Sequence, residues 1–327
     1  MIAWMFPGQG SQRPAMAAGL DSCHELFRSG RKVLGVDLER ICTSDDTAWP
    51  AEILQPALFT TCVGAGRALL SQGLRPEAVV GHSLGEFAAL CVVGVLSYED
   101  GLRLVFARGR AMSAAARRAA GGMAAVIGLD AASIEAVCEE IGAVWVANWN
   151  SPKQVVISGR DESLARAAEA CREAGAARVV RLKVPMAGHC PLMEPAAEEF
   201  KAAIAEVEVR APSCAFYSVV DARTHDDPEE IRDLLVSAIT SPVRFADALY
   251  AMHAWGVKGF VEVGPARVLT GLARQTLSGV GLASVATDGE AEALAFSIYP
   301  MGFKNGFEAD APITIQLSEA QAVRGSA

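Results

Sequence analysis

Short apolar runs alternate with longer helical segments along most of this chain, and their order predicts an α/β fold. Three apolar runs have the length of buried strands: residues 2–6, 78–80 and 259–263. Six longer segments have the length and composition of helices: residues 52–70, 98–116, 191–207, 228–239, 243–255 and 266–277. This alternation favours a largely parallel sheet with helices on both faces. The segment 52–70 has no polar face, so we expect that helix to lie deep against the sheet.

A change to shorter secondary-structure elements between residues 122 and 186 predicts a small second domain. Its elements are short: strand 123–129, helix 131–141, strands 144–148 and 154–158, helix 162–174 and strand 178–184. This βαββαβ order is that of a split βαβ unit, so we expect a ferredoxin-like domain inserted into the larger one. The large domain then comprises residues 1–121 and 187–286, and the small domain residues 122–186. Residues 287–327 are left as an unassigned tail or linker, with a helical turn or two at 290–296 and a short strand at 313–317.

Composition excludes several classes of protein. The hydrophobic fraction of 51% rules out wholesale disorder, and no uninterrupted apolar stretch reaches the roughly 18 residues of a membrane-spanning helix. No basic segment of a signal peptide precedes the first strand, so we expect a cytoplasmic protein that binds no membrane. The net charge of -9 argues against nucleic acid as a partner, because that binding needs clustered Lys and Arg. The eight cysteines form no C-x-x-C pair, and we expect most of them to be small core residues.

One stretch carries candidate chemistry: the sequence Gly81-His82-Ser83-Leu84-Gly85, between an apolar strand and an Ala- and Leu-rich helical segment. The pattern G-x-S-x-G is typical of a nucleophile elbow, in which glycines permit a sharp turn that lifts a serine hydroxyl clear of the backbone. An ordinary strand-turn-helix junction is the alternative. A serine nucleophile needs a base to take its proton. His82 is expected to point away from its neighbour Ser83, which favours a structural hydrogen bond.

His189 has the most suitable setting among the five histidines. It follows a predicted strand and precedes a predicted helix, at a position where α/β sheets gather their active sites. This setting fits a base and fits a capping or core role equally well. Arg108, in the helix after Ser83, is a candidate partner for a substrate carboxylate. The spacing of Arg103, Arg108 and Arg110 by itself favours a solvated helix face.

Four motifs, in this order along the chain, resemble the malonyl-CoA:acyl-carrier-protein transacylases and the acyltransferase domains of polyketide synthases. They are Phe6-Pro7-Gly8-Gln9-Gly10-Ser11-Gln12, Gly81-His82-Ser83-Leu84-Gly85-Glu86, Arg108-Gly109 and Gly188-His189-Cys190. Supporting stretches are Gln55-Pro56-Ala57-Leu58, residues 150–159 and Glu262-Val263-Gly264-Pro265. The resemblance runs from residue 1 to about residue 285. It implies an α/β-hydrolase-like large domain with a parallel-sheet core and an inserted ferredoxin-like small domain.

The resemblance implies a role for each motif residue. Ser83 is the nucleophile that carries the acyl group, and His189 is its base. Gln9 and the backbone N–H of Leu84 form the oxyanion hole. Arg108 binds the free carboxylate of a malonyl group and disfavours neutral acyl chains, which would leave its charge unpaired.

Three further positions follow from the same resemblance. The backbone carbonyl of Ala238 orients His189, at a position where many relatives carry glutamine. Gly188, where relatives often carry phenylalanine or serine, and Met112 are positions of substrate selectivity. A glycine at 188 removes bulk and could admit an α-substituent, whereas Leu84 matches malonyl-specific members. The resemblance therefore favours malonyl and leaves a substituted malonyl unit open.

The expected activity is a ping-pong transfer from malonyl-CoA to the phosphopantetheine thiol of an acyl carrier protein, which supplies fatty-acid or polyketide synthesis. Malonyl-CoA and the carrier protein are partners as substrates, and we expect no bound cofactor and no metal. One alternative is an acyl hydrolase that clears acyl groups from carrier proteins; Arg108 argues against it, since hydrolases have no carboxylate to hold. Another is a non-catalytic scaffold, which would not need the full catalytic set.

Overall fold

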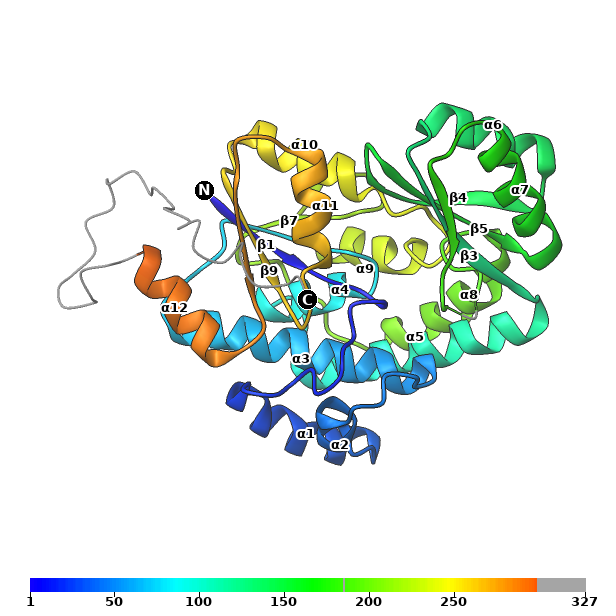
Figure 1. Ribbon diagram of the computed structural model, residues 1–327. Helices are drawn as coiled ribbons and strands as arrows, with labels where there is room; N and C mark the ends of the chain where they lie inside the picture. The colour runs from blue at the N-terminus through cyan, green and yellow to red at the C-terminus, as the bar shows by residue number, and fades with distance from the viewer. Residues whose placement is uncertain (185, 299–327) are drawn as a thin grey trace.

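The computed structural model describes residues 1–184 and 186–298, which form two sheets with helices packed around them (Figure 1). The larger sheet has six strands in the order β10-β9-β1-β2-β7-β8. These are β1 (Ile2–Phe6), β2 (Ala78–Gly81), β7 (Ala215–Tyr217), β8 (Thr224–His225), β9 (Gly259–Val263) and β10 (Gly281–Val285). Every neighbouring pair is parallel except β7 and β8, which confirms the largely parallel sheet that the alternation predicted.

Helices cover both faces of this sheet, because successive side chains of each buried strand point to opposite sides. Ile2, Trp4 and Phe6 of β1 pack in one apolar core, and Ala3 and Met5 pack in the other. The first core holds residues of α1 (His24–Leu34), α2 (Leu38–Thr43), α3 (Ala51–Ser71), α4 (Gly85–Val92), α5 (Tyr98–Arg118), α8 (Glu194–Ala205) and α9 (Pro228–Ser237). The second core holds residues of α10 (Phe245–Trp255) and α11 (Val268–Thr276).

Helix α3 is long and apolar enough, by length and composition alone, to cross a membrane. However, 83% of its apolar window is buried inside the protein, where it packs against α5, α4 and α12. The prediction that this helix lies deep in the fold is therefore confirmed. The expected cytoplasmic location stays a prediction.

A second sheet of four antiparallel strands stands beside the first, at the right of Figure 1. Its strands are β3 (Gly121–Ile127), β4 (Val144–Ser151), β5 (Gln154–Arg160) and β6 (Arg178–Arg181), in the order β4-β5-β3-β6. Helices α6 (Ala131–Ile141) and α7 (Asp161–Glu173) pack against it. The predicted βαββαβ order is thus present, although β6 is shorter than the expected strand 178–184.

The segment after residue 287 differs from the expected linker. Helix α12 (Asp288–Ile298) packs against α3, with Ala291 and Ala295 in the large core. The Ser22 hydroxyl also donates to the Asp288 carboxylate over 2.6 Å. The sequence pattern underestimates this helix because its buried face consists mainly of alanine, which gives a weak apolar period. The expected strand at 313–317 lies outside the described residues.

Three strands of the larger sheet were not predicted. Strands β7 and β8 have only three and two residues, and β10 is half-buried and rich in small residues. The helix expected from residue 243 begins at Phe245, because the backbone of Val243 instead pairs with β4. The helix expected from residue 191 begins with a 3₁₀ turn, Pro191–Met193, before α8.

Candidate active site

Ser83 occupies the turn between β2 and α4, and its backbone has a φ of 54°, in the left-handed region. A non-glycine residue there is uncommon and stores strain of the kind found at functional sites. The two glycines of the motif make the turn possible: a Cβ at Gly81 would lie 2.0 Å from the Glu86 nitrogen, and one at Gly85 would lie 1.9 Å from the Phe6 carbonyl oxygen. The sequence therefore forms the strand-turn-helix geometry of a nucleophile elbow.

His189 meets Ser83 across the site. Its Nε2 atom lies 2.8 Å from Ser83 Oγ, and its Nδ1 atom lies 2.8 Å from the carbonyl oxygen of Ala238 and 3.2 Å from that of Ser241. A carbonyl only accepts hydrogen bonds, so Nδ1 carries the proton and Nε2 accepts the hydroxyl proton of Ser83. The His189 backbone also has a positive φ of 61°. Two residues separated by 106 positions are thus held as a nucleophile and base pair.

Burial keeps His189 neutral. His189 is only 6% exposed. This burial, together with the nearby charge of Arg108 and with His82, lowers the pKa of the His189 imidazole from 6.5 to about 3. The two carbonyl acceptors act in the opposite direction because they favour the charged ring. A neutral imidazole can accept the Ser83 proton, so the lowered pKa keeps the base active in mildly acidic solution.

This pKa predicts the acid side of the pH profile. Because the base form of His189 persists below pH 6.5, kcat/KM for acylation of Ser83 should not fall as the pH drops through 6.5. Removal of the Arg108 charge should raise the pKa of His189 and move the acid limb to higher pH, measurable with acetyl-CoA as the donor. Burial raises the pKa of Glu86 to about 7, so Glu86→Gln is the control that removes a second titration. An acid limb at pH 6.5 in both wild type and Glu86→Gln would contradict the assignment.

Arg108 is 3% exposed and points into the site from α5. Its Nη2 atom donates to Ser83 Oγ over 3.0 Å, and its Nη1 atom donates to Gln55 Oε1 over 3.0 Å. Among the described residues no carboxylate lies within 4 Å of this guanidinium. Burial lowers its pKa to about 10, so it remains charged at neutral pH. The solvated-face interpretation is therefore wrong for Arg108, although Arg103 and Arg110 are exposed and pair with Asp100 and Glu199.

Two buried polar residues in the motifs had no predicted role. Gln55 is fully buried in α3 and holds Arg108 through its side-chain oxygen. Glu86 is 1% exposed, accepts the Val219 N–H over 3.0 Å, and partly balances the Arg108 charge. A glutamine inside a largely apolar helix was the available sequence signal for Gln55, since a buried amide needs a partner.

The expected oxyanion residues lie beside the elbow. The loop after β1 packs on the turn, where the His82 N–H donates to the Phe6 carbonyl over 2.8 Å, and this contact brings Gln9 to the Ser83 cavity. The backbone N–H of Leu84 makes no hydrogen bond within the part of the chain that the structure describes, and it lies at the N-terminus of α4. Free N–H groups at a helix N-terminus can stabilise developing negative charge.

Ser83, Arg108 and His189 line a cavity of about 250 Å³ between the two sheets. Gly188 and Met112 also line it, which places the two predicted selectivity positions at the site. A Cβ built at Gly188 would lie 3.7 Å from Met112 Cε and 3.7 Å from Met123 Sδ, at ordinary contact distance. A methyl side chain at position 188 would therefore fit without a clash.

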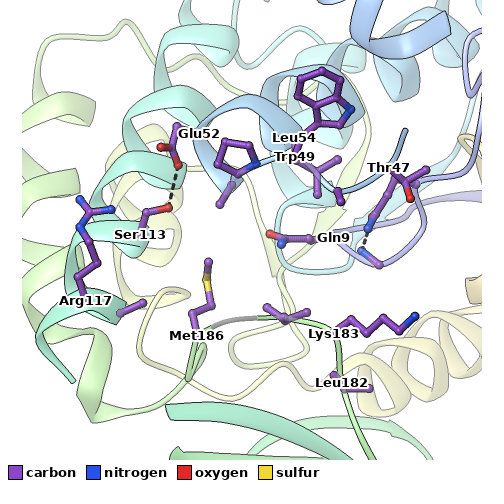
Figure 2. A pocket seen from close by; sticks show the side chains of 17 residues that line it. Gln9, Thr47, Trp49, Glu52, Leu54, Ser113, Arg117, Leu182, Lys183 and Met186 are labelled. Atoms are coloured by element: carbon purple, nitrogen blue, oxygen red, sulfur yellow. Dashed lines mark hydrogen bonds between the residues drawn. The ribbon is translucent and has the colours of Figure 1, made fainter. Parts of the chain in front are cut away.

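A second hollow of about 630 Å³ adjoins this cavity, and Gln9, Gly10, Leu182, Val184 and Met186 line both. In Figure 2 the side chain of Gln9 extends into the hollow, between Trp49 and Met186. On its far side the Ser113 hydroxyl donates to Glu52 over 2.8 Å. Gln9 thus lies where the two spaces meet.

The cysteines and the other potential metal ligands lie outside the Ser83–His189 pair. The eight cysteines are free; six are buried, and two are intermediate. Within residues 1–184 and 186–298, no group of three or more His, Cys, Asp or Glu side chains could hold a metal ion. His82 makes the structural hydrogen bond that was expected of it, from its Nε2 to Asn150 Oδ1 over 2.8 Å.

Comparison with known proteins places the chain in one family. The model of the acyl transferase domain family matches residues 3–296. The chain belongs to the acyl transferase domain family. It is 40% identical over 288 residues to the malonyl CoA-acyl carrier protein transacylase of Salmonella typhimurium, covering 84% of this chain and 92% of that protein. The resemblance to malonyl-CoA:acyl-carrier-protein transacylases that the motifs predicted is confirmed.

Solved structures of family members share the fold. The malonyl CoA-acyl carrier protein transacylase from Coxiella burnetii superposes with a TM-score of 0.87 at 33% identity, covering 89% of this chain and 96% of that chain. A malonyl-transacylase solved in complex with its type II polyketide synthase acyl-carrier protein gives a TM-score of 0.86 at 35% identity, covering 89% and 97% of the two chains. The arrangement of the two sheets is therefore that of the family.

Proposed function

We propose that this protein transfers a malonyl group from malonyl-CoA to the phosphopantetheine thiol of an acyl carrier protein, for fatty-acid or polyketide synthesis. The observation that carries the proposal is the buried Arg108 guanidinium, which has no carboxylate partner within the described residues and lies 3.0 Å from Ser83 Oγ. A buried cation is costly unless an anion pairs with it, so a substrate carboxylate beside the reacting carbonyl completes the site. Malonyl carries that carboxylate.

The first half-reaction acylates Ser83. Its Oγ attacks the thioester carbonyl while His189 Nε2 takes the hydroxyl proton, and the tetrahedral oxyanion lies against Gln9 and the Leu84 N–H. The C–S bond then breaks, and the CoA sulfur leaves with the proton held by His189. Preorganised donors of this kind each contribute about 10²- to 10³-fold in rate.

The second half-reaction reverses these steps with a different thiol. The carrier-protein thiol loses its proton to His189 and attacks the ester carbonyl of malonyl-Ser83. The C–O bond breaks, and Ser83 recovers its proton from His189. The carbonyl of Ala238 holds the Nδ1–H throughout, so the same tautomer serves both half-reactions. No bound cofactor takes part in these steps.

The two sheets also support a division of the chain into two domains. The order β4-β5-β3-β6 and its two helices support a ferredoxin-like domain inserted near residues 122–186 into an α/β-hydrolase-like domain. We place the enzyme in the cytoplasm, where malonyl-CoA and carrier proteins are available.

A substituted malonyl unit is the second candidate substrate, and one observation favours it. Gly188 lines the Ser83 cavity without a side chain, so it removes the bulk that a phenylalanine or serine at this position would place there. Competition between malonyl-CoA and methylmalonyl-CoA for Ser83 measures this choice directly.

Intact-protein mass spectrometry distinguishes the proposal from hydrolysis and from a scaffold role. After mixing with malonyl-CoA, the protein should gain the mass of one malonyl group, and that group should pass to added carrier protein. Rapid loss to water without the carrier protein would instead indicate the hydrolase. No adduct would indicate the scaffold.

A further inference from the structure

Glu86, three residues after the nucleophile, is a buried carboxylate that neither half-reaction uses. It is 1% exposed and lies in the first turn of α4, where its backbone N–H donates to the Ser83 carbonyl over 3.0 Å. A Cβ at Gly81 would lie 2.0 Å from the Glu86 nitrogen, so the elbow packs tightly around this residue. The same turn that presents the Ser83 hydroxyl therefore also sets the place of the Glu86 side chain.

The Glu86 side chain holds the loop that follows β7. Its Oε1 atom accepts the backbone N–H of Val219 over 3.0 Å, and Val219 is itself 1% exposed. A buried N–H is almost always paired, so the position of this loop depends on the Glu86 acceptor. Burial raises the pKa of Glu86 to about 7, but a neutral carboxyl group keeps its carbonyl oxygen. The acceptor is therefore present in both charge states.

The loop in turn holds the segment that carries the hydrogen-bond acceptors of His189. The Val219 carbonyl accepts the Arg244 N–H over 2.7 Å, at one end of residues 238–244. Three carbonyls of this segment face His189: two lie 2.8 and 3.2 Å from its Nδ1 atom, and one accepts its backbone N–H over 3.2 Å. The backbone of Val243 also pairs with β4, which gives the segment a second anchor.

We propose that Glu86 is a positioning residue, which fixes His189 relative to Ser83 by holding residues 238–244 through Val219. The inference rests on the proposed function and adds to it the means by which nucleophile and base keep their 2.8 Å contact. A misplacement of about 1 Å can cost about 10²-fold in rate. Because β4 anchors the same segment, loss of the Glu86 bond should displace the base without unfolding the site.

Two substitutions that both remove the charge isolate the hydrogen bond. Glu86→Gln keeps an acceptor oxygen for Val219, whereas Glu86→Leu has none. Relative to Glu86→Gln, Glu86→Leu should slow Ser83 acylation about 10²-fold, and by the same factor with malonyl-CoA and acetyl-CoA, because the base serves both donors. Equal rates in the two variants, or a difference confined to malonyl-CoA, would overturn the proposal.

The His189 ring gives a readout that needs no acyl donor. Nitrogen NMR of histidine-labelled protein distinguishes the two tautomers, and His189→Ala identifies the resonances. In wild type and Glu86→Gln the proton should reside on Nδ1, facing its carbonyl acceptors. In Glu86→Leu those acceptors are displaced, so both tautomers should be populated. A His189 spectrum in Glu86→Leu identical to that of Glu86→Gln would overturn the proposal, whatever the acylation rates.

A loss of stability alone should not reproduce these effects. The control, Thr60→Val, removes another buried hydrogen bond, the 2.9 Å contact between the hydroxyls of Thr60 and Tyr98. It should lower Tm but leave the acylation rate and the His189 spectrum unchanged, measured well below the Tm of each variant. Acylation as slow in Thr60→Val as in Glu86→Leu would overturn the proposal.

Glu86→Asp serves if Glu86→Leu does not fold. It keeps the charge but withdraws the acceptor from Val219 by one methylene, so it should also populate both His189 tautomers and slow acylation. A wild-type spectrum and rate in Glu86→Asp would overturn the proposal. Failure of wild type to form malonyl-Ser83 would overturn the proposed function instead, whereas the tautomer of His189 is measured without any donor.

Discussion

Replacing His189 by alanine should slow acylation of Ser83 by malonyl-CoA about 10⁴-fold, the upper range for loss of a general base. The physical reason is that Ser83 Oγ, 2.8 Å from Nε2, has no other neutral imidazole to take its proton. The His82 ring is already held by a hydrogen bond from its Nε2 to the Asn150 side chain, so we do not expect it to substitute. Rapid-quench mass spectrometry of the acyl-enzyme measures the rate.

The matched control is His225→Ala. That histidine pairs with Asp221 and Glu230 away from the site, so its loss should leave the acylation rate unchanged. The Tm of His189→Ala shows whether the variant is folded. A folded His189→Ala protein that acylates within tenfold of wild type would falsify the role of His189 as base.

Arg108→Ala should reverse the choice of acyl group. Without the guanidinium, the malonyl carboxylate is buried unpaired, and kcat/KM for malonyl-CoA should fall about 10²- to 10³-fold. Acetyl-CoA brings no carboxylate, and the vacated space no longer holds an uncompensated cation, so its kcat/KM should rise or stay level. The ratio of the two constants in a competition assay is the quantity to measure.

Arg110→Ala provides the control for this variant, because Arg110 lies on the same helix but is exposed and paired with Glu199 over 3.2 Å. Its loss should leave the ratio of malonyl to acetyl transfer unchanged, since exposed ion pairs contribute little. If Arg108→Ala kept the malonyl preference of wild type, the carboxylate-binding role would be wrong.

Much of the fold could be predicted because its strands and helices have strong apolar periods. Strand β1 and helix α3 are almost wholly buried, and their runs of apolar residues have no other explanation. Strands β7 and β8 could not be found in this way, because two or three residues show no period. Helix α12 was underestimated because its two buried residues are alanines.

Some features of the candidate site can likewise be predicted from a local sequence pattern, whereas others depend on residues far apart in the chain. The nucleophile elbow at Ser83 can be predicted from the sequence because the glycines that its sharp turn requires lie within a few residues of the serine. The burial of Arg108 could not be derived from spacing, since it depends on Gln55 in another helix.

The central claim is that malonyl transfer proceeds through an ester on Ser83. Peptide mapping of the protein quenched after mixing with malonyl-CoA should place one malonyl group on Ser83, and Ser83→Ala should show no adduct while retaining the wild-type Tm. Addition of carrier protein should then remove the group from Ser83 and add it to the phosphopantetheine thiol. Malonyl labelling that persists in Ser83→Ala, or transfer to the carrier protein by that variant at the wild-type rate, would contradict the account.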